Sequence, residues 1–440
     1  MAASKLSVGR KRLVLVAPGS LGDVQPFVAL AGGLGRAGWL VRVATHETFR
    51  PLVEAQGVEF AALTGDPQAL LLDPASQRIV DSHGNPLRAL RGFRSALREL
   101  GNSIVADAWQ AARDADAVMH CGPLSLPAFY AAQALKLPSI GAAVQPLTPT
   151  RTFATVAAGA PRFPGPVNLL SHLLAEQAFW GLFRPAVSRW RQTHDQHASP
   201  PLLGPFRTWR GHGHPFLYGF SPTVVSKPHD WGPDDHVTGA WQVDSPAEAH
   251  LSDELETFLA AGPPPVYVGF GSMTTSDPRA LTEVVAGAIQ RTGHRAVLGS
   301  GWVGLGATQR SERILVIGET PHDLLFPRML AVIHHGGAGT THTGLRAGVP
   351  SLAVPFGADQ AFWGNRIAAI GAGPPPIPRR TLTTDRLASA INTMATNDGL
   401  RGRAAIIAKR LAEERGIDQA VTIIAQTLGG YPQPEAPYGP

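Results

Sequence analysis

The residues with the clearest potential for chemistry lie at 331–360, AVIHHGGAGTTHTGLRAGVPSLAVPFGADQ. There His334 and His335 precede a glycine-rich turn, and Thr340 and Thr341 follow it. Imidazole rings, threonine hydroxyls and the unpaired N–H groups of a helix N-terminus can all donate hydrogen bonds to an anion. Glycines allow the backbone to approach that anion closely. An apolar strand, this turn and a helix together predict a phosphate site.

A carboxylate and an amide, Asp359 and Gln360, end the same stretch after a second apolar strand at 351–354. Such a pair can hold the neighbouring hydroxyl groups of a sugar. Open parallel sheets bind ligands at the C-terminal ends of their strands, so the turn and the pair are expected at one edge. The combination predicts a nucleotide-sugar site, and an ordinary βα turn with glycines for packing is the alternative. The turn has neither the Walker sequence nor the G-x-G-x-x-G of dinucleotide folds.

The candidate general base is Asp23, in the loop PGSLGD that follows the first predicted strand at 12–17. A carboxylate there could take a proton from an attacking hydroxyl. The same position is the start of a predicted helix, which lowers the pKa of a carboxylate and weakens it as a base. A helix-capping role for Asp23 is therefore the alternative.

Strands and helices alternate through most of the chain, which predicts an α/β fold with mostly parallel sheets. We expect a flexible lead at 1–10, an acceptor-binding domain at 11–243, a linker at 244–262, a nucleotide-sugar domain at 263–415, a helix at 416–430 that crosses back to the first domain, and a disordered tail at 431–440. One long helix is expected at 87–113. The alternation fails at 145–214, where aromatic residues are dense and a pair of amphipathic helices is expected at 169–190. Those aromatic residues could line a pocket or pack in the core.

Composition narrows the class of protein. At 440 residues, with 44% hydrophobic and 16% charged residues, the chain is expected to be globular with two domains. No apolar run reaches the ~20 residues that span a bilayer, and no signal peptide is expected. The single Cys121 indicates a reducing cytoplasm. A net charge of +5 admits peripheral contact with the inner membrane face, and no nucleic-acid module is present.

The motifs HHGGAGTT and LRAGVPSLAVPFGADQ resemble the donor-site signature of the family-one inverting glycosyltransferases. Within that family the chain resembles the branch of sterol 3-beta-glucosyltransferases and bacterial antibiotic and lipid glycosyltransferases. Further similar segments are PGSLGDVQP, FLYGFSPTVV, HVTGAW, VYVGFGSM and PHDLLFPR. The resemblance implies the GT-B architecture, in which two Rossmann-like βαβ domains face each other across a cleft. It also implies that no metal and no cofactor take part.

The resemblance assigns roles to particular residues. Asp23 is implied as the catalytic base, because the family places His or Asp there and the Gly-Asp-x-x-Pro pattern is intact. The implied donor contacts are Ser20, Gly22, Ser272, Trp302, His335, Gly337, Gly339, Thr340, Asp359 and Gln360. Acceptor contacts are expected from His46, His120, Phe153, Phe179 and Trp180. Two positions depart from the family: Leu21 stands where related branches carry Arg, and Glu319 stands where plant members carry the Trp that stacks on uracil.

The expected reaction is transfer of a hexose to a hydroxyl of a hydrophobic acceptor, such as a sterol, a lipid or an aromatic or polyketide natural product, giving a β-glycoside. The expected donor is UDP-glucose, with a dTDP-sugar as the alternative. A nucleotide-sugar 2-epimerase on the same fold and a non-catalytic transferase-like binding partner are the rival hypotheses. The sequence leaves both a monomer and a dimer open.

Overall fold

The computed structural model describes residues 11–65, 100–159, 163–194, 199–209, 213–246, 248–271, 273, 277–301 and 311–429. The predicted lead at 1–10, the tail at 431–440 and the first part of the helix predicted at 87–113 lie outside these residues. Two predicted donor contacts, Ser272 and Trp302, also lie outside them.

The first half of the chain forms a seven-stranded sheet in the order β3-β2-β1-β4-β5-β6-β7, and all of its strand pairs are parallel. Its strands are β1 (Arg12–Val16), β2 (Leu40–His46), β3 (Glu59–Leu63), β4 (Ala117–Cys121), β5 (Ser139–Ala143), β6 (Phe216–Tyr218) and β7 (Asp235–Val237). Its helices are α1 (Leu21–Arg36), α2 (Arg50–Glu54), α6 (Leu126–Ala134), α7 (Gly165–His194) and α8 (Phe206–Trp209). Every residue of β4 and β5 is buried, as expected for central parallel strands that are covered on both faces.

The second half forms a five-stranded parallel sheet in the order β10-β9-β8-β11-β12. Its strands are β8 (Val266–Gly269), β9 (Ala296–Gly299), β10 (Ile314–Ile317), β11 (Ala331–His334) and β12 (Ser351–Ala353). The helices around it are α9 (Asp253–Ala260), α10 (Pro278–Thr292), α11 (His322–Leu325), α12 (Ala338–Arg346), α13 (Gln360–Ala369), α14 (Thr384–Thr396) and α15 (Asp398–Ala412). The predicted α/β class with parallel sheets is confirmed.

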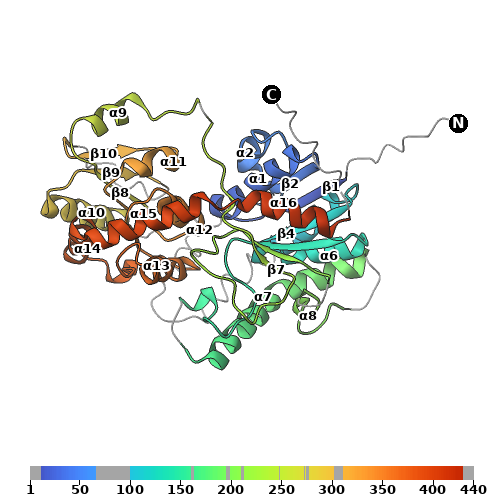
Figure 1. The fold of residues 1–440 in the computed structure, drawn as a ribbon. Helices are drawn as coiled ribbons and strands as arrows, with labels where there is room; N and C mark the ends of the chain where they lie inside the picture. The colour runs from blue at the N-terminus through green and yellow to red at the C-terminus, as the bar shows by residue number, and fades with distance from the viewer. Residues whose placement is uncertain are drawn as a thin grey trace.

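The two halves share one hydrophobic core. Phe27 of α1, Trp241 and Trp363 of α13 belong to the same buried cluster. The last helix, α16 (Gly416–Thr427), lies beside α1 although it follows the second half in sequence (Figure 1). A Cβ atom added at Gly33 would lie 2.2 Å from Cγ2 of Ile417, so α1 and α16 are in close contact.

The region at 145–214 contains one long helix where two were expected. α7 runs without a break over 30 residues, and Pro185 lies inside it. Proline removes one helical hydrogen bond and usually bends the helix, but tertiary packing holds α7 together. Trp180, Phe183 and Val187 on its second half are buried against α6. None of the described helices is both long enough and apolar enough to cross a membrane.

Candidate active site

The glycine-rich turn joins β11 to α12 at the C-terminal edge of the second sheet. His334, the last residue of β11, is fully buried, and its Nδ1 accepts a hydrogen bond from the N–H of Gly336 at 3.0 Å. His335 follows and is half-buried. A Cβ atom at Gly337 would lie 2.4 Å from Nε2 of His335. Because real Cβ atoms do not come that close, glycine is the residue that leaves room for the His335 ring.

The His335 ring is enclosed from a second side by the turn that follows β8. A Cβ atom at Gly271 would lie 3.4 Å from Cε1 of His335. This burial lowers the pKa of His335 to about 4, with a smaller contribution from nearby His322. Nδ1 of His335 is buried and has no hydrogen-bond partner within the described part of the chain. The His335 ring is therefore neutral near pH 7, and its Nδ1 can form a hydrogen bond with a bound ligand.

The first turn of α12 adds backbone donors beside that ring. Gly337 is the N-cap residue of α12 and has no side chain that could satisfy the N–H groups of the first turn. The N–H groups of Ala338, Gly339 and Thr340 precede the first intrahelical bond, which runs from the N–H of Thr341 to Gly337. Aligned peptide dipoles give this end a partial positive charge. His335, Gly339 and Thr340 are thus brought together around one position that favours an anion.

Asp359 and Gln360 point in different directions at the neighbouring strand end. Oδ2 of Asp359 accepts a hydrogen bond from Nε1 of Trp363 at 2.7 Å. Gln360 is buried, and its Oε1 accepts from the N–H groups of Phe356 and Gly357 at 2.7 and 3.1 Å. In this structure Gln360 closes its own loop, whereas the sequence predicted that it would present its amide to a sugar. The loop N–H groups need an acceptor, and Gln360 supplies it.

Asp23 lies in the first turn of α1, at the C-terminal edge of the first sheet. Its Oδ2 accepts hydrogen bonds from the N–H and the hydroxyl of Ser20, at 3.0 and 2.9 Å. Gly19 has a φ of +132°, and a Cβ atom there would lie 2.7 Å from Oδ2 of Asp23. The capping role is therefore present. Even so, burial raises the pKa of Asp23 more than the Ser20 hydrogen bonds lower it, contrary to the sign expected from helix position.

The carboxylates of Asp23 and Asp359 belong to opposite halves of the molecule and influence each other. The pKa of Asp359 is raised to about 6, chiefly by burial. The hydrogen bond from Trp363 lowers this pKa, and the negative charge of Asp23 raises it. The structure thus brings together, between the two sheets, a carboxylate with a raised pKa, a second carboxylate and the anion site of α12.

Comparison with known proteins supplies the family. Residues 13–142 match the glycosyltransferase family 28 N-terminal domain, and residues 309–428 match the erythromycin biosynthesis protein CIII-like C-terminal domain. Sterol 3-beta-glucosyltransferase UGT80B1 of Arabidopsis thaliana is 35% identical over 422 residues, covering 94% of this chain and 68% of that protein. The chain belongs to the glycosyltransferase family that includes the sterol 3-beta-glucosyltransferases. The sterol 3-beta-glucosyltransferase of Cryptococcus neoformans is 33% identical, and the chain spans only 27% of its length.

Solved structures agree with the fold expected for this glycosyltransferase family. The calicheamicin glycosyltransferase CalG4 has a TM-score of 0.70 at 16% identity, with 96% of this chain and 99% of that chain covered. The glycotransferase of kitacinnamycin gives a TM-score of 0.70 at 17% identity, covering 96% of this chain and 100% of that chain. The predicted GT-B architecture is confirmed.

His46 of this glycosyltransferase supports the Asp23 loop and is not open to an acceptor. Its Nε2 accepts from the N–H of Gly19 at 3.2 Å, and its Nδ1 lies 3.0 Å from the carbonyl oxygen of Gly65. The ring is 2% exposed. The sequence placed His46 correctly at the end of β2, but burial and two backbone partners leave it no atom for a substrate.

His120 and Trp180 are also packed inside the first half, contrary to the acceptor role expected for them. His120 stacks on Trp209 with ring centroids 4.6 Å apart, and burial lowers its pKa to about 3. Trp180 donates its indole N–H to the carbonyl oxygens of Pro201 and Leu202. Both side chains therefore pack in the interior near α6, α7 and α8.

Phe153 and Phe179, the other expected acceptor contacts, lie in different surroundings. Phe153 packs edge-to-face on Phe362 of α13, with ring centroids 5.3 Å apart, so it lies where the two halves meet. Phe179 is half-buried on α7 and packs against the cluster around Trp180. The five predicted acceptor residues therefore do not line one surface.

His342 is a residue of the site that the sequence argument did not identify. Its Nδ1 lies 2.7 Å from the carbonyl oxygen of Ala338, and its Nε2 accepts from the N–H of Ser221 at 3.1 Å. The ring is buried and its pKa is lowered to about 4. His342 thus ties the first turn of α12 to the first half of the chain. Its place four residues after Ala338, on the inner face of a helix, was the available signal.

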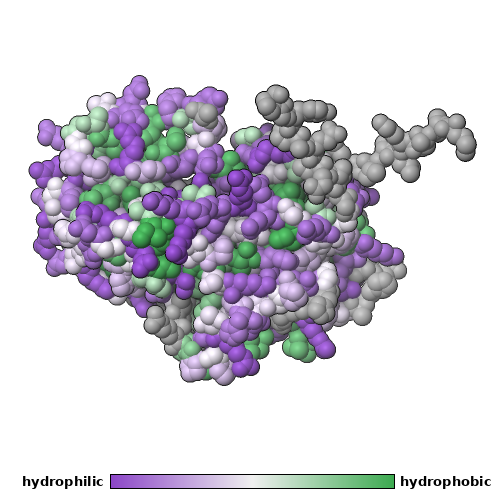
Figure 2. Space-filling view, viewed as in Figure 1, coloured by the Kyte–Doolittle hydropathy of each residue, from purple (hydrophilic) through white to green (hydrophobic). Residues whose placement is uncertain are grey.

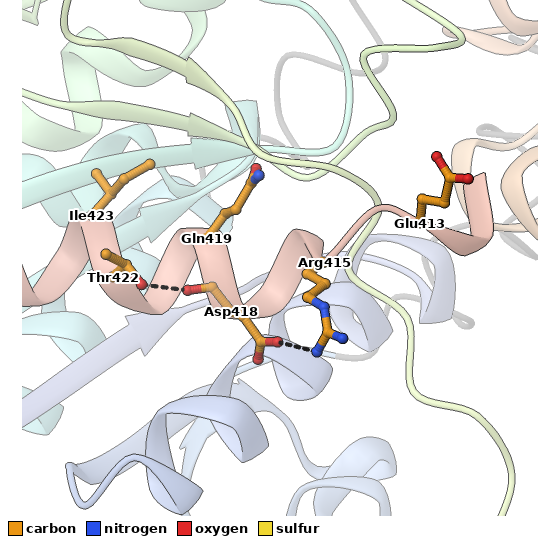
Figure 3. A pocket seen from close by; sticks show the side chains of 6 residues that line it. All are labelled: Glu413, Arg415, Asp418, Gln419, Thr422 and Ile423. Carbon is orange, nitrogen blue, oxygen red and sulfur yellow. Dashed lines mark hydrogen bonds and ion pairs between the residues drawn. The ribbon is translucent and has the colours of Figure 1, made fainter. Parts of the chain in front are cut away.

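The surface hollow along α16 has no part in this arrangement. It has a volume of about 390 Å³ and is lined by Glu413, Arg415, Asp418, Gln419, Thr422 and Ile423 (Figure 3). None of these side chains is a predicted site residue, and Arg415 and Asp418 already form an ion pair across it at 3.8 Å. Within the described ranges, no group of three or more His, Cys, Asp or Glu side chains is arranged to hold a metal ion.

Proposed function

We propose that this glycosyltransferase moves a hexose from a nucleoside-diphosphate sugar to a hydroxyl of a hydrophobic acceptor, with inversion at the anomeric carbon. The observation that carries the proposal is that the charge of Asp23 in one half acts on Asp359 in the other half, while α1, which holds Asp23, contacts α12. An attacking group and a leaving group need such opposed positions.

The donor diphosphate would occupy the position next to His335 and the first turn of α12. His335 has a buried nitrogen without a partner among the described residues, and its ring lies against Gly337, the N-cap of the helix whose first turn carries the N–H groups of Gly339 and Thr340. Bonds from these donors strengthen as the glycosidic oxygen takes up negative charge, so they stabilise the transition state more than the ground state. Ser20, Gly22, Ser272 and Trp302 remain proposed donor contacts.

Asp23 would take the proton of the acceptor hydroxyl. As that O–H bond breaks, the oxygen forms a bond to the anomeric carbon from the face opposite the diphosphate. The bond from that carbon to the phosphate oxygen breaks, and the nucleoside diphosphate leaves with the electron pair. An α-linked donor then gives a β-glycoside. The raised pKa of Asp23 suits a general base that acts near neutral pH.

Asp359 would hold a sugar hydroxyl through its carboxylate, whose orientation is fixed by the hydrogen bond from Trp363 to Oδ2. We propose UDP-glucose as the donor and a dTDP-sugar as the alternative. The relatives named as sterol 3-beta-glucosyltransferases favour a sterol as the first acceptor class to examine. We further propose that the domain at residues 11–243 binds the acceptor and that the domain at residues 263–415 binds the donor. The proposed location of the enzyme is the cytoplasm.

The test is product detection by mass spectrometry with purified protein, UDP-glucose, EDTA and a panel of sterols, flavonoids and macrolides. A hexose added to one class, and its loss in Asp23→Asn, would support the proposal. A changed sugar nucleotide without acceptor would identify an epimerase. Donor binding without any product across UDP- and dTDP-sugars would favour a non-catalytic partner.

A further inference from the structure

The first half of α7 carries an unusual distribution of polar and apolar side chains. Its inner face is polar: Asn168 donates from Nδ2 to the carbonyl oxygens of Arg151 and Phe163, at 3.0 and 3.1 Å. Nε2 of His172 lies 3.0 Å from the carbonyl oxygen of Phe153. Both side chains are buried. Asn168 and His172 thus turn polar groups toward the inside of the protein, although Oδ1 of Asn168 has no hydrogen-bond partner among the described residues. This polarity is the reverse of an ordinary surface helix.

The outer face of the same helix is apolar and exposed. Leu174 is 62% exposed, and Leu202 and Leu203 of the adjoining loop are 69% and 68% exposed. Nε2 of Gln177 donates to the carbonyl oxygen of Leu203 at 3.1 Å, which fixes the loop beside the helix. We call the following exposed residues the leucine face: Phe163, Val167, Leu170, Leu173, Leu174, Leu202 and Leu203. Figure 1 places α7 and α8 at the lower edge of the molecule, where Figure 2 shows a few hydrophobic residues among hydrophilic ones.

Charge is absent from the leucine face and present at its borders. Residues 163–175 and 199–206 contain no Asp, Glu, Lys or Arg. Arg151 is exposed beside the start of α7, where a Cβ atom at Gly165 would lie 3.2 Å from its Cβ. Arg207 is exposed directly after the second segment. Glu176 follows the first segment and is half-buried, so the border carries two exposed cations and one anion. An apolar helix face with exposed cations at its border is typical of a helix that lies in the boundary between water and lipid headgroups.

We propose that the leucine face docks this glycosyltransferase on the surface of a lipid bilayer. The residue types favour lipid over a protein partner, since binding hot spots on proteins are rich in Trp, Tyr and Arg and poor in Leu. α7 also lies at the edge of the molecule in Figure 1, where a helix can meet a flat surface. The described helices offer no span, so the contact is with the membrane surface.

The docked face lies two contacts away from the proposed active site. His172 of α7 is bonded to Phe153, and Phe153 packs on Phe362 in the helix that follows Asp359. Docking through the leucine face would therefore bring the membrane, and a lipid-soluble acceptor in it, close to the proposed active site. The docking stands without the proposed reaction, but this advantage rests on that function.

The test is co-sedimentation with phosphatidylcholine vesicles, with and without phosphatidylglycerol, in the absence of donor and acceptor. We expect the wild type to sediment with both vesicles, and more strongly with the anionic ones. Leu174→Glu, and separately Leu202→Ser with Leu203→Ser, should reduce the partition coefficient about tenfold or more. Ile406→Glu is the matched control, because Ile406 is 48% exposed on α15 and lies outside the leucine face.

Three results would overturn the docking: a wild type that stays in solution, a Leu174→Glu variant that sediments as the wild type does, or an Ile406→Glu variant that loses binding equally. A wild type that ignores vesicles but dimerises in analytical ultracentrifugation, with Leu174→Glu monomeric, would assign the face to a second copy. Donor affinity in solution is measured alongside, so a failed membrane contact is distinguished from a failed transferase assignment.

Discussion

Replacing Gly337 by alanine tests whether the His335 ring has the position on which donor binding depends. The new Cβ atom would lie 2.4 Å from Nε2 of His335, so the ring must move by about 1 Å to restore ordinary contact. A hydrogen bond lengthened by that amount falls outside the useful range of 2.7–3.2 Å. The backbone of Gly337, with φ −64° and ψ 150°, is one that alanine adopts freely, so strain is not the cause.

The size of the effect follows from the bond that is lost. Hydrogen bonds to charged groups contribute about 1.5–3 kcal/mol, so donor affinity should fall roughly 10- to 150-fold in Gly337→Ala. Isothermal titration calorimetry with UDP and UDP-glucose measures this directly. Gly402→Ala, at an exposed helix position with no atom within 4 Å of the new Cβ, controls for a glycine-to-alanine change and should bind as the wild type does.

A double-mutant cycle separates this mechanism from general damage. If Gly337→Ala acts by displacing the ring, it should have little further effect once His335 is already alanine. Equal losses in both backgrounds would refute the reasoning, and so would a Gly337→Ala protein that binds donor normally. Thermal unfolding of each variant shows whether the fold is retained.

Three further outcomes are expected. Asp23→Asn should lower kcat by about 100-fold or more with donor affinity unchanged in calorimetry; an unchanged kcat would leave Asp23 as a helix cap only. Burial raises the pKa of Asp359 to about 6 from its ordinary value of 3.8, so this group should make the free energy of unfolding fall as pH rises from 4 to 6. Buried histidines titrate in the same range with the opposite sign, so the contribution of Asp359 is the difference in slope between the wild type and Asp359→Asn in urea titrations. Stability should rise more steeply with pH in Asp359→Asn than in the wild type, and equal slopes would contradict the prediction. His342 has a folded pKa of about 4 against 6.5, so its contribution to stability should be lost as pH falls between those values. His342→Ala should flatten that slope and weaken donor binding; a variant with wild-type stability and affinity would mean that the bond to Ser221 does not hold α12.

The sequence predicted what depends on local pattern. Apolar strands followed by helices predicted an α/β fold with parallel sheets, and both sheets are parallel. The turn at His335 was identified because glycines and donors are adjacent in the chain. These features need no knowledge of residues far away in sequence.

What the sequence did not predict depends on distant partners. Gln360 turns inward because the loop at Phe356 leaves two N–H groups without an acceptor, and that loop shape is not written in local pattern. His342 bonds to Ser221, a residue 121 positions away. Burial raises the pKa of Asp23, whereas the sequence predicted a lowered pKa from its position at the start of a helix.

The close packing of α16 on α1 has a consequence for hybrid enzymes. A chimera that joins the first half of one relative to the second half of another cannot be made with a single junction near residue 244. Ile417 meets Gly33 so closely that a larger residue at position 33 would displace the helix. The second junction belongs near residue 415, so that α16 is inherited together with α1, on which it packs.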